Sequence, residues 1–176
     1  MSAQIRFGDP MKLIKLEDNL FAQLAKKRGY LVEEASRKMI QAGIDLILKG
    51  IYKAKNKKVT MLFAIKRRKK NKSSRYLDRW TWLEFNGREG SDGWLYGPAH
   101  FIAFERSKDY IVVSRKALLE HVQKEGRIRW DMPFVAAPKE AKYKIYKNPK
   151  TQAVITQILS KEILKLEGAQ SWKKDG

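Results

Sequence analysis

Residues 43–70, GIDLILKGIYKAKNKKVTMLFAIKRRKK, decide how the rest of the chain is expected to fold. The first part, residues 44–48, is a short apolar run interrupted by Asp45, which predicts a buried strand. Residues 59–68 are rich in β-forming side chains, and their alternation with a period of two predicts a second strand. The lysine-rich stretch between the two predicts a solvated hairpin tip or the first half of the second strand.

An aspartate inside an apolar strand is costly to bury unless a positive group lies beside it. Asp45 therefore predicts a cation or a metal ion nearby. In the second strand, the period of two places Ala64 and Lys66 on one face. This makes Lys66 a candidate partner for Asp45 and marks Ala64, two positions before the lysine, as conspicuous.

Composition narrows the class of protein. The 176 residues are 43% hydrophobic, which suits one globular domain with a genuine core. The 38 Lys and Arg residues exceed the 19 Asp and Glu residues, and the resulting net charge of +19 favours nucleic acid as a partner. No apolar run is long enough to span a membrane, no signal-peptide pattern is present, and cysteine is absent. We therefore expect an intracellular protein that does not bind membranes.

The basic residues gather on both sides of the proposed Asp45–Lys66 site and are candidates for contacts with DNA phosphates, which set register without reading sequence. They are Lys53, Lys55, Lys57, Lys58, Arg67, Arg68, Lys69, Lys70 and Lys72.

The expected organisation is a flexible leader at residues 1–14, a single domain at 15–168 and a flexible tail at 169–176. Residues 15–28, KLEDNLFAQLAKKR, have apolar side chains at helical spacing, and Gly29 is suited to end that helix. Glu17 falls in the first turn, where the helix dipole favours a carboxylate.

Further strands and helices are expected downstream. Residues 79–85, RWTWLEF, predict a strand, and the glycine-rich residues 86–93 predict a hairpin turn. Residues 110–122 and 153–166 share one pattern, an apolar strand followed by a leucine-bearing helix. We expect these two units at opposite ends of one sheet.

Several kinds of catalytic site are excluded because the sequence lacks their motifs. The two histidines are separated and have no ligand-spaced neighbours, and there is no phosphate-binding glycine motif or supported serine triad. What remains is carboxylate and metal chemistry, in which a divalent ion polarises a phosphodiester and a lysine offsets charge or orients water.

The order of these parts resembles small phage and archaeal members of the PD-(D/E)XK nuclease superfamily, which includes Holliday-junction resolvases. The resemblance rests on an acid-bearing first helix, on GIDLIL, on a strand ending as an acid-x-Lys signature would, and on RWTWLEF with GWLYGPAHFIAFE and YIVVSRKALLEHV. It implies a restriction-endonuclease-like α/β fold with a central mixed sheet flanked by helices. It also implies an endodeoxyribonuclease that uses Mg²⁺ (or Mn²⁺), acts on branched DNA, forms a homodimer and, if viral, works in the host cytoplasm.

By this resemblance, Asp45 corresponds to the metal-binding aspartate, Lys66 to the signature lysine and Glu17 to an acid that some members carry on the first helix. The backbone carbonyl of Ile65 would be a further metal ligand. The departure is Ala64, which stands where the family has Asp or Glu. Loss of that acid removes a ligand and a negative charge, so this chain is expected to bind Mg²⁺ poorly and to be largely inactive.

Three explanations for Ala64 compete. The acid could have been replaced deliberately to trap a DNA complex, or the chain could be a naturally inactive descendant that still binds DNA. Alternatively the register is misplaced, or another strand supplies the acid, for which Glu84 is the only good candidate. The rival from another class is a non-catalytic DNA- or RNA-binding protein that uses the same basic face.

Overall fold

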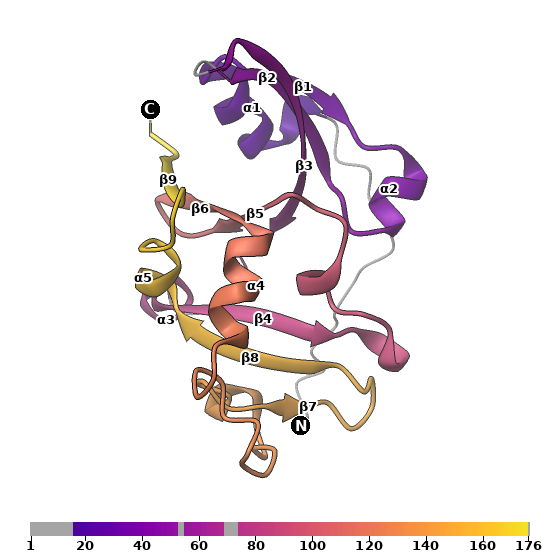
Figure 1. Ribbon diagram of the computed structural model, residues 1–176, viewed down its shortest axis with the longest axis vertical. Helices are drawn as coiled ribbons and strands as arrows, with labels where there is room; N and C mark the ends of the chain where they lie inside the picture. Colours follow the sequence, from indigo (N-terminus) through magenta and orange to yellow (C-terminus); the bar gives the residue numbers. More distant parts are fainter. Residues whose placement is uncertain (1–15, 53–54, 69–73, 176) are drawn as a thin grey trace.

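The computed structural model describes residues 16–52, 55–68 and 74–175, so the expected leader at residues 1–14 lies outside the described residues. The chain adopts an α/β fold with a mixed six-stranded sheet and a second, three-stranded sheet (Figure 1). The strands of the larger sheet, in spatial order, are β1 (Leu31–Glu34), β2 (Leu46–Tyr52), β3 (Lys57–Lys66), β5 (Phe101–Glu105), β6 (Asp109–Ser114) and β9 (Gln170–Lys173).

The smaller sheet and the helices complete the fold. The smaller sheet has the order β4 (Trp80–Asn86), β8 (Val154–Leu159), β7 (Tyr146–Lys147). The α-helices are α1 (Leu20–Lys27), α2 (Arg37–Gln41), α3 (Ser74–Arg79), α4 (Arg115–Gln123) and α5 (Ser160–Ile163). Short 3-10 turns are η1 (Leu16–Asp18), η3 (Arg88–Gly90), η4 (Trp94–Tyr96) and η5 (Pro138–Glu140). None of the described helices has the length and apolar character needed to cross a bilayer.

The connection between β3 and β5 positions the candidate site. Strands β1, β2 and β3 form an antiparallel meander, whereas β5 lies beside β3 and runs parallel to it. A parallel pair needs a crossover, and this one contains α3, β4, η3 and η4. The chain therefore leaves the larger sheet at Lys66, contributes β4 to the smaller sheet and returns as β5.

Two apolar cores lie on opposite faces of the larger sheet, because successive side chains of a strand point to opposite faces. On one face, Phe63 and Ile65 of β3 pack in the cluster that contains the buried side of α1. On the other face, Ala64 packs with the inner side chains of β4, including Leu83, and with α4. Figure 1 shows α4 lying between the ends of the two sheets.

The first helix differs from its expected limits. Asn19 caps α1 through its side chain, which accepts a hydrogen bond from the Ala22 N–H, so the helix begins at Leu20. Glu17 consequently lies in the preceding turn η1 and not in the first turn of the helix. Gly29 ends the helix as expected, with a φ of +85° that favours glycine.

The expectation of a flexible tail at residues 169–176 is wrong for its described part. Residues of β9 pair antiparallel with β6, and Trp172 is only 3% exposed. Its ring stacks on Phe21 of α1 at a centroid distance of 5.1 Å, and the Arg28 guanidinium lies 4.8 Å from its centroid. The aromatic anchor, which composition alone does not reveal, holds this segment in the sheet.

The expected α/β fold with a mixed sheet flanked by helices is confirmed, but the second, three-stranded sheet was not expected. Strand β6 with α4 belongs to the larger sheet, whereas β8 with α5 belongs to the smaller one. The two similar strand and helix units therefore lie in different sheets. The turn at residues 86–93 reverses the chain as expected, because Asn86 and Asp92 form an antiparallel bridge and the Gly87 N–H donates to the Ser91 carbonyl at 2.8 Å. The main partner of β4 is nevertheless the distant β8.

A buried ion pair beside β9 leads to a stability prediction. Asp109 is buried and accepts two hydrogen bonds from Arg106, at 2.7 and 2.6 Å, and one from the Ser171 hydroxyl. Burial alone would raise the pKa of Asp109, but these hydrogen bonds outweigh it and lower the pKa.

We expect Asp109→Asn to lower the free energy of unfolding at pH 7 by about 1–2 kcal/mol, since Arg106 loses its charged partner but keeps some exposure to water. A lowered pKa contributes stability above the unfolded pKa, and this contribution disappears as the pH falls through the folded value. Urea denaturation should therefore give a difference between wild type and variant that shrinks below pH 4. A difference that is constant between pH 7 and pH 3 would contradict this origin.

Candidate functional site

Asp45 lies immediately before β2, where the polar backbone of two adjacent strands holds it. Its N–H donates to the Phe63 carbonyl at 2.8 Å, and its Oδ2 accepts from the Ile65 N–H at 2.6 Å. Because Leu46 pairs with Phe63, Asp45 stands opposite Ala64 and shares the sheet face that carries Ala64 and Lys66. Surrounding protein raises the pKa of Asp45, although the residue remains open to solvent on one side.

Lys66 is the last residue of β3 and is half-buried. Burial lowers the pKa of its ammonium group, while the negative charges of Asp45 and Glu84 act in the opposite direction. Its Nζ lies 4.8 Å from the centroid of the Trp94 ring, a distance suited to a cation–π interaction. Lys66 therefore lies against an aromatic face and within the electrostatic influence of two carboxylates.

Glu84 reaches the same place from β4 of the smaller sheet. Its carboxylate accepts a hydrogen bond from the Trp94 N–H, and burial raises its pKa despite the nearby positive charges of Lys66 and Arg88. The turn requires glycine at position 93, because a Cβ there would lie 2.3 Å from the Glu84 carbonyl oxygen. This close approach brings Trp94 beside both Glu84 and Lys66.

We call Asp45, Lys66 and Glu84 the charged trio. Two carboxylates from different sheets act electrostatically on one lysine, yet among the described residues Lys66 forms no direct ion pair with either. The raised pKa values of the two acids mean that their negative charges are incompletely compensated. A further cation near the trio would therefore be favourable.

The residues of the trio could supply some, but not all, of the ligands of a Mg²⁺ ion. The described residues contain no group of three or more Asp, Glu, His or Cys side chains placed to hold a metal ion. Mg²⁺, however, is usually bound through one or two carboxylates, with waters and substrate phosphates completing the octahedron. Each carboxylate of the trio accepts one hydrogen bond from a backbone N–H and keeps its other lone pairs for a metal ion.

The Ile65 carbonyl is also placed on the correct edge for its expected role. The Ile65 N–H points toward Asp45, and in an extended strand the N–H and C=O of one residue point to the same edge. Its side chain faces the opposite way, into the core beside α1. The carbonyl oxygen therefore faces the side of the strand on which Asp45 lies.

Two of the expected site residues, Ala64 and Glu17, do not belong to the charged trio. Ala64 is 1% exposed and belongs to an apolar cluster that includes Leu83, Phe85 and Ile102. Glu17 is exposed in η1, and within the described part of the chain no hydrogen bond or ion pair joins it to Asp45 or Lys66. Its backbone carbonyl instead accepts from the Gln23 side chain.

The expected DNA-contacting residues are described only in part. Lys53, Lys69, Lys70 and Lys72 lie outside the described residues, and Lys55, Lys57 and Lys58 are exposed where β2 turns into β3. Arg67 and Arg68 follow Lys66 directly. Arg67 is exposed, whereas Arg68 is half-buried and lies 4.0 Å from Asp78.

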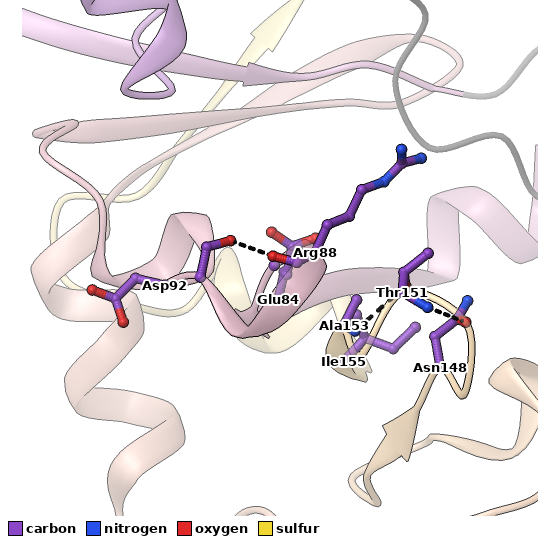
Figure 2. Close-up of a pocket in the computed structure, with 9 residues that line it drawn as sticks. Glu84, Arg88, Asp92, Asn148, Thr151, Ala153 and Ile155 are labelled. Carbon is purple, nitrogen blue, oxygen red and sulfur yellow. Dashed lines mark hydrogen bonds between the residues drawn. The ribbon is translucent and has the colours of Figure 1, made fainter.

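A cavity of about 340 Å³ adjoins the trio, with Glu84 in its wall (Figure 2). It lies between the turn after β4, which contributes Arg88 and Ser91, and the turn before β8, which contributes Asn148 and Thr151. No sequence pattern indicated this cavity, because its two turns are about 60 residues apart and meet only through the pairing of β4 with β8.

Comparison with known proteins gives no match: no protein-family model, no curated protein and no solved structure matches this chain.

Proposed function

We propose that this protein is a Mg²⁺-dependent endodeoxyribonuclease acting on branched DNA, with the charged trio as its catalytic centre. The observation that carries the proposal is the position of Lys66, whose ammonium group lies 4.8 Å from the Trp94 ring and interacts electrostatically with one carboxylate from the edge of the larger sheet and one from the smaller sheet. Perturbed pKa values that arise from burial and specific charged partners are common at catalytic sites.

Each residue of the trio has a role in this reaction. Asp45 and Glu84 would hold the ion, with the Ile65 carbonyl oxygen as a further ligand. A bound Mg²⁺ supplies Lewis-acid polarisation of the phosphate and lowers the pKa of a coordinated water. Lys66 offsets the negative charge that develops on the phosphate or orients the attacking water, and Trp94 restricts where its ammonium group lies.

The partner proposed for this centre follows from charge. The net charge of +19 repels itself in the absence of an anion, and DNA phosphates supply one at high density. Exposed lysines at the β2–β3 turn and Arg67 beyond the trio extend the positive surface. Contacts of this kind bind backbone without reading bases, which suits a nuclease that selects substrate by structure.

In this proposal, Glu84 takes the role of the acid that is missing at position 64. The second carboxylate comes from β4, which is part of the crossover between β3 and β5. Its Glu84 interacts electrostatically with Lys66. Position 64 then serves packing, consistent with its 1% exposure among apolar side chains. The chain is accordingly proposed to be an intact nuclease, in place of the impaired form expected from the acid-x-Lys signature.

Ala64→Asp tests this assignment. We expect the variant to lose about 2 kcal/mol or more of unfolding free energy, because a carboxyl group would enter an apolar cluster, and to gain no nuclease activity. Urea denaturation and cleavage of a panel of linear, flapped and four-way DNA measure the two effects. Ala64→Asn is the matched control, because Asn has the size of Asp without its negative charge.

An Ala64→Asp variant that folds normally and cuts at least tenfold faster than wild type would instead support the replaced-acid explanation. The wild-type reaction tests the function itself, with Mg²⁺ and with EDTA on the same panel. If wild type cuts no substrate but binds all of them without metal, the non-catalytic DNA- or RNA-binding alternative is favoured.

A further inference from the structure

The cavity beside Glu84 has features of a ligand site that the trio does not explain. Glu84 contributes to its wall, so whatever occupies the cavity lies next to the proposed catalytic centre. Its volume of about 340 Å³ is at the lower end of the range for small-molecule sites, a size that suits one nucleoside and not a stacked base pair.

Both turns that border the cavity hold a backbone conformation that is uncommon for residues other than glycine. Glu89 has a φ of +56° and Gln152 a φ of +62°. Such conformations cost of order 1 kcal/mol each and are concentrated at functional sites. A hydrogen bond of 2.8 Å from the Glu89 N–H to the Thr151 carbonyl fixes the two turns to each other.

The cavity also carries polar groups with unused bonding capacity. The Asn148 side-chain oxygen accepts from the backbone of Lys150 and Thr151, which fixes the side chain, and its NH₂ group donates to no described residue. Thr151 contributes a hydroxyl, while Ala153 and Ile155 supply an apolar wall. A nucleobase presents this combination of hydrogen-bonding edge and apolar face.

Arg88 stands at the rim and supplies a cation. In Figure 2 its side chain extends away from the cavity floor, beside the Glu84 carboxylate. The residue is exposed, and its guanidinium forms no ion pair with a described residue although it lowers the pKa of Glu84. An exposed guanidinium that forms no ion pair with a described residue and belongs to a residue lining the cavity is suited to a phosphate.

We propose that this cavity receives one unpaired nucleotide of a DNA substrate, with its phosphate on Arg88 and its base between Asn148 and Ala153. The inference rests on the proposed function, since it places this nucleotide next to the phosphate cut at the trio. A paired nucleotide cannot enter without leaving the helical stack, which costs a few kcal/mol, so DNA that already has an unpaired nucleotide at a branch or flap is preferred. The substrate class is therefore DNA with a single-stranded junction beside the cut.

The test measures binding without Mg²⁺, so that cleavage plays no part. Fluorescently labelled DNA of one sequence is prepared as a perfect duplex, as a duplex with a single-stranded flap, and as the same flap with a base-free tetrahydrofuran nucleotide at the junction. We expect wild type to bind the flap about tenfold more tightly than either other DNA, an affinity difference within the range for one stacked base.

Arg88→Ala should lower affinity for the flap about tenfold and affinity for the duplex little. Thr151→Trp, which fills the cavity, should abolish the difference between the flap with and without the base. Lys150→Ala is the matched control, because it removes a positive charge from the same turn outside the cavity wall and should weaken all three complexes equally. Circular dichroism confirms that each variant is folded.

Two results would overturn the inference: wild type binding the flap equally with and without its base, or Arg88→Ala weakening duplex and flap alike. Cleavage of the same DNAs with Mg²⁺ is recorded separately. A preference for the unpaired nucleotide without any cleavage would support the nucleotide site and contradict the nuclease activity. Cleavage without that preference would support the nuclease activity and contradict the nucleotide site.

Discussion

Glu84→Gln is expected to reduce Mg²⁺-dependent cleavage of branched DNA by about 100-fold or more, the order of loss seen when a group that stabilises transition-state charge is removed. The amide keeps the size of the side chain and can still accept from the Trp94 N–H, but it carries no negative charge for a metal ion. Single-turnover cleavage at saturating enzyme measures the loss in the chemical step, separate from DNA binding.

The same variant should keep its affinity for DNA without Mg²⁺, because it removes a negative charge from a surface that meets phosphates. Glu89→Gln is the matched control: Glu89 is an exposed acid in the turn that follows β4, and its loss should change cleavage less than twofold. Asp45→Asn should match Glu84→Gln, and the double variant should be little worse than either, since groups that act as a unit are not additive.

A thermal shift gives a readout that does not depend on turnover. Mg²⁺ that binds only the folded protein raises its melting temperature, and this rise should vanish in Glu84→Gln and Asp45→Asn but persist in Glu89→Gln. If Glu84→Gln cuts as fast as wild type, Glu84 is a structural acid and the assignment of the second carboxylate fails.

Trp172→Ala is expected to lower the free energy of unfolding by about 3–5 kcal/mol, the usual cost of truncating a buried tryptophan. The ring is 3% exposed, and stacks on Phe21 and, at 6.0 Å, on Tyr30, while Arg28 lies over it. Small domains are stable by only about 5–15 kcal/mol, so this loss would bring the chain near its limit.

Urea denaturation followed by circular dichroism measures this loss, and Trp130→Ala is the matched control. Trp130 is 52% exposed and packs by its edge on Phe85 at 4.9 Å, so its truncation should cost about 1 kcal/mol. Equal losses from the two tryptophans would mean that β9 is not a fixed part of the sheet in solution.

Local patterns predicted much of the larger sheet. The alternation of residues 59–68 corresponds to β3, and the leucine-bearing helix expected within residues 110–122 corresponds to α4. Asp45 and Lys66 were expected together because an aspartate in a buried strand needs a positive group beside it, and Lys66 lies in the strand expected next along the chain. Hydrophobic periodicity identifies such elements with their local connections, and this was sufficient to place two of the three residues of the trio.

The remainder depended on pairings between distant parts of the chain. Periodicity indicates that residues 79–85 form a strand, but it does not specify that β8 is the neighbour or that a second sheet results. The position of Glu84 beside Lys66 follows from that second sheet and from the tight turn at Gly93. The segment of Trp172 was expected to be flexible, whereas the contacts of its aromatic ring fix it in the sheet.

The position of β9 at the margin of the larger sheet has a consequence for synthesis of the chain. Strand β6 is made about 60 residues before β9, and until β9 has left the ribosome the outer side of β6 has unpaired N–H and C=O groups. Open edges of this kind pair readily with other chains. We therefore expect a ribosome-bound or prematurely terminated chain that lacks residues 170–173 to depend on chaperones, and full solubility to be reached only once the last strand is released.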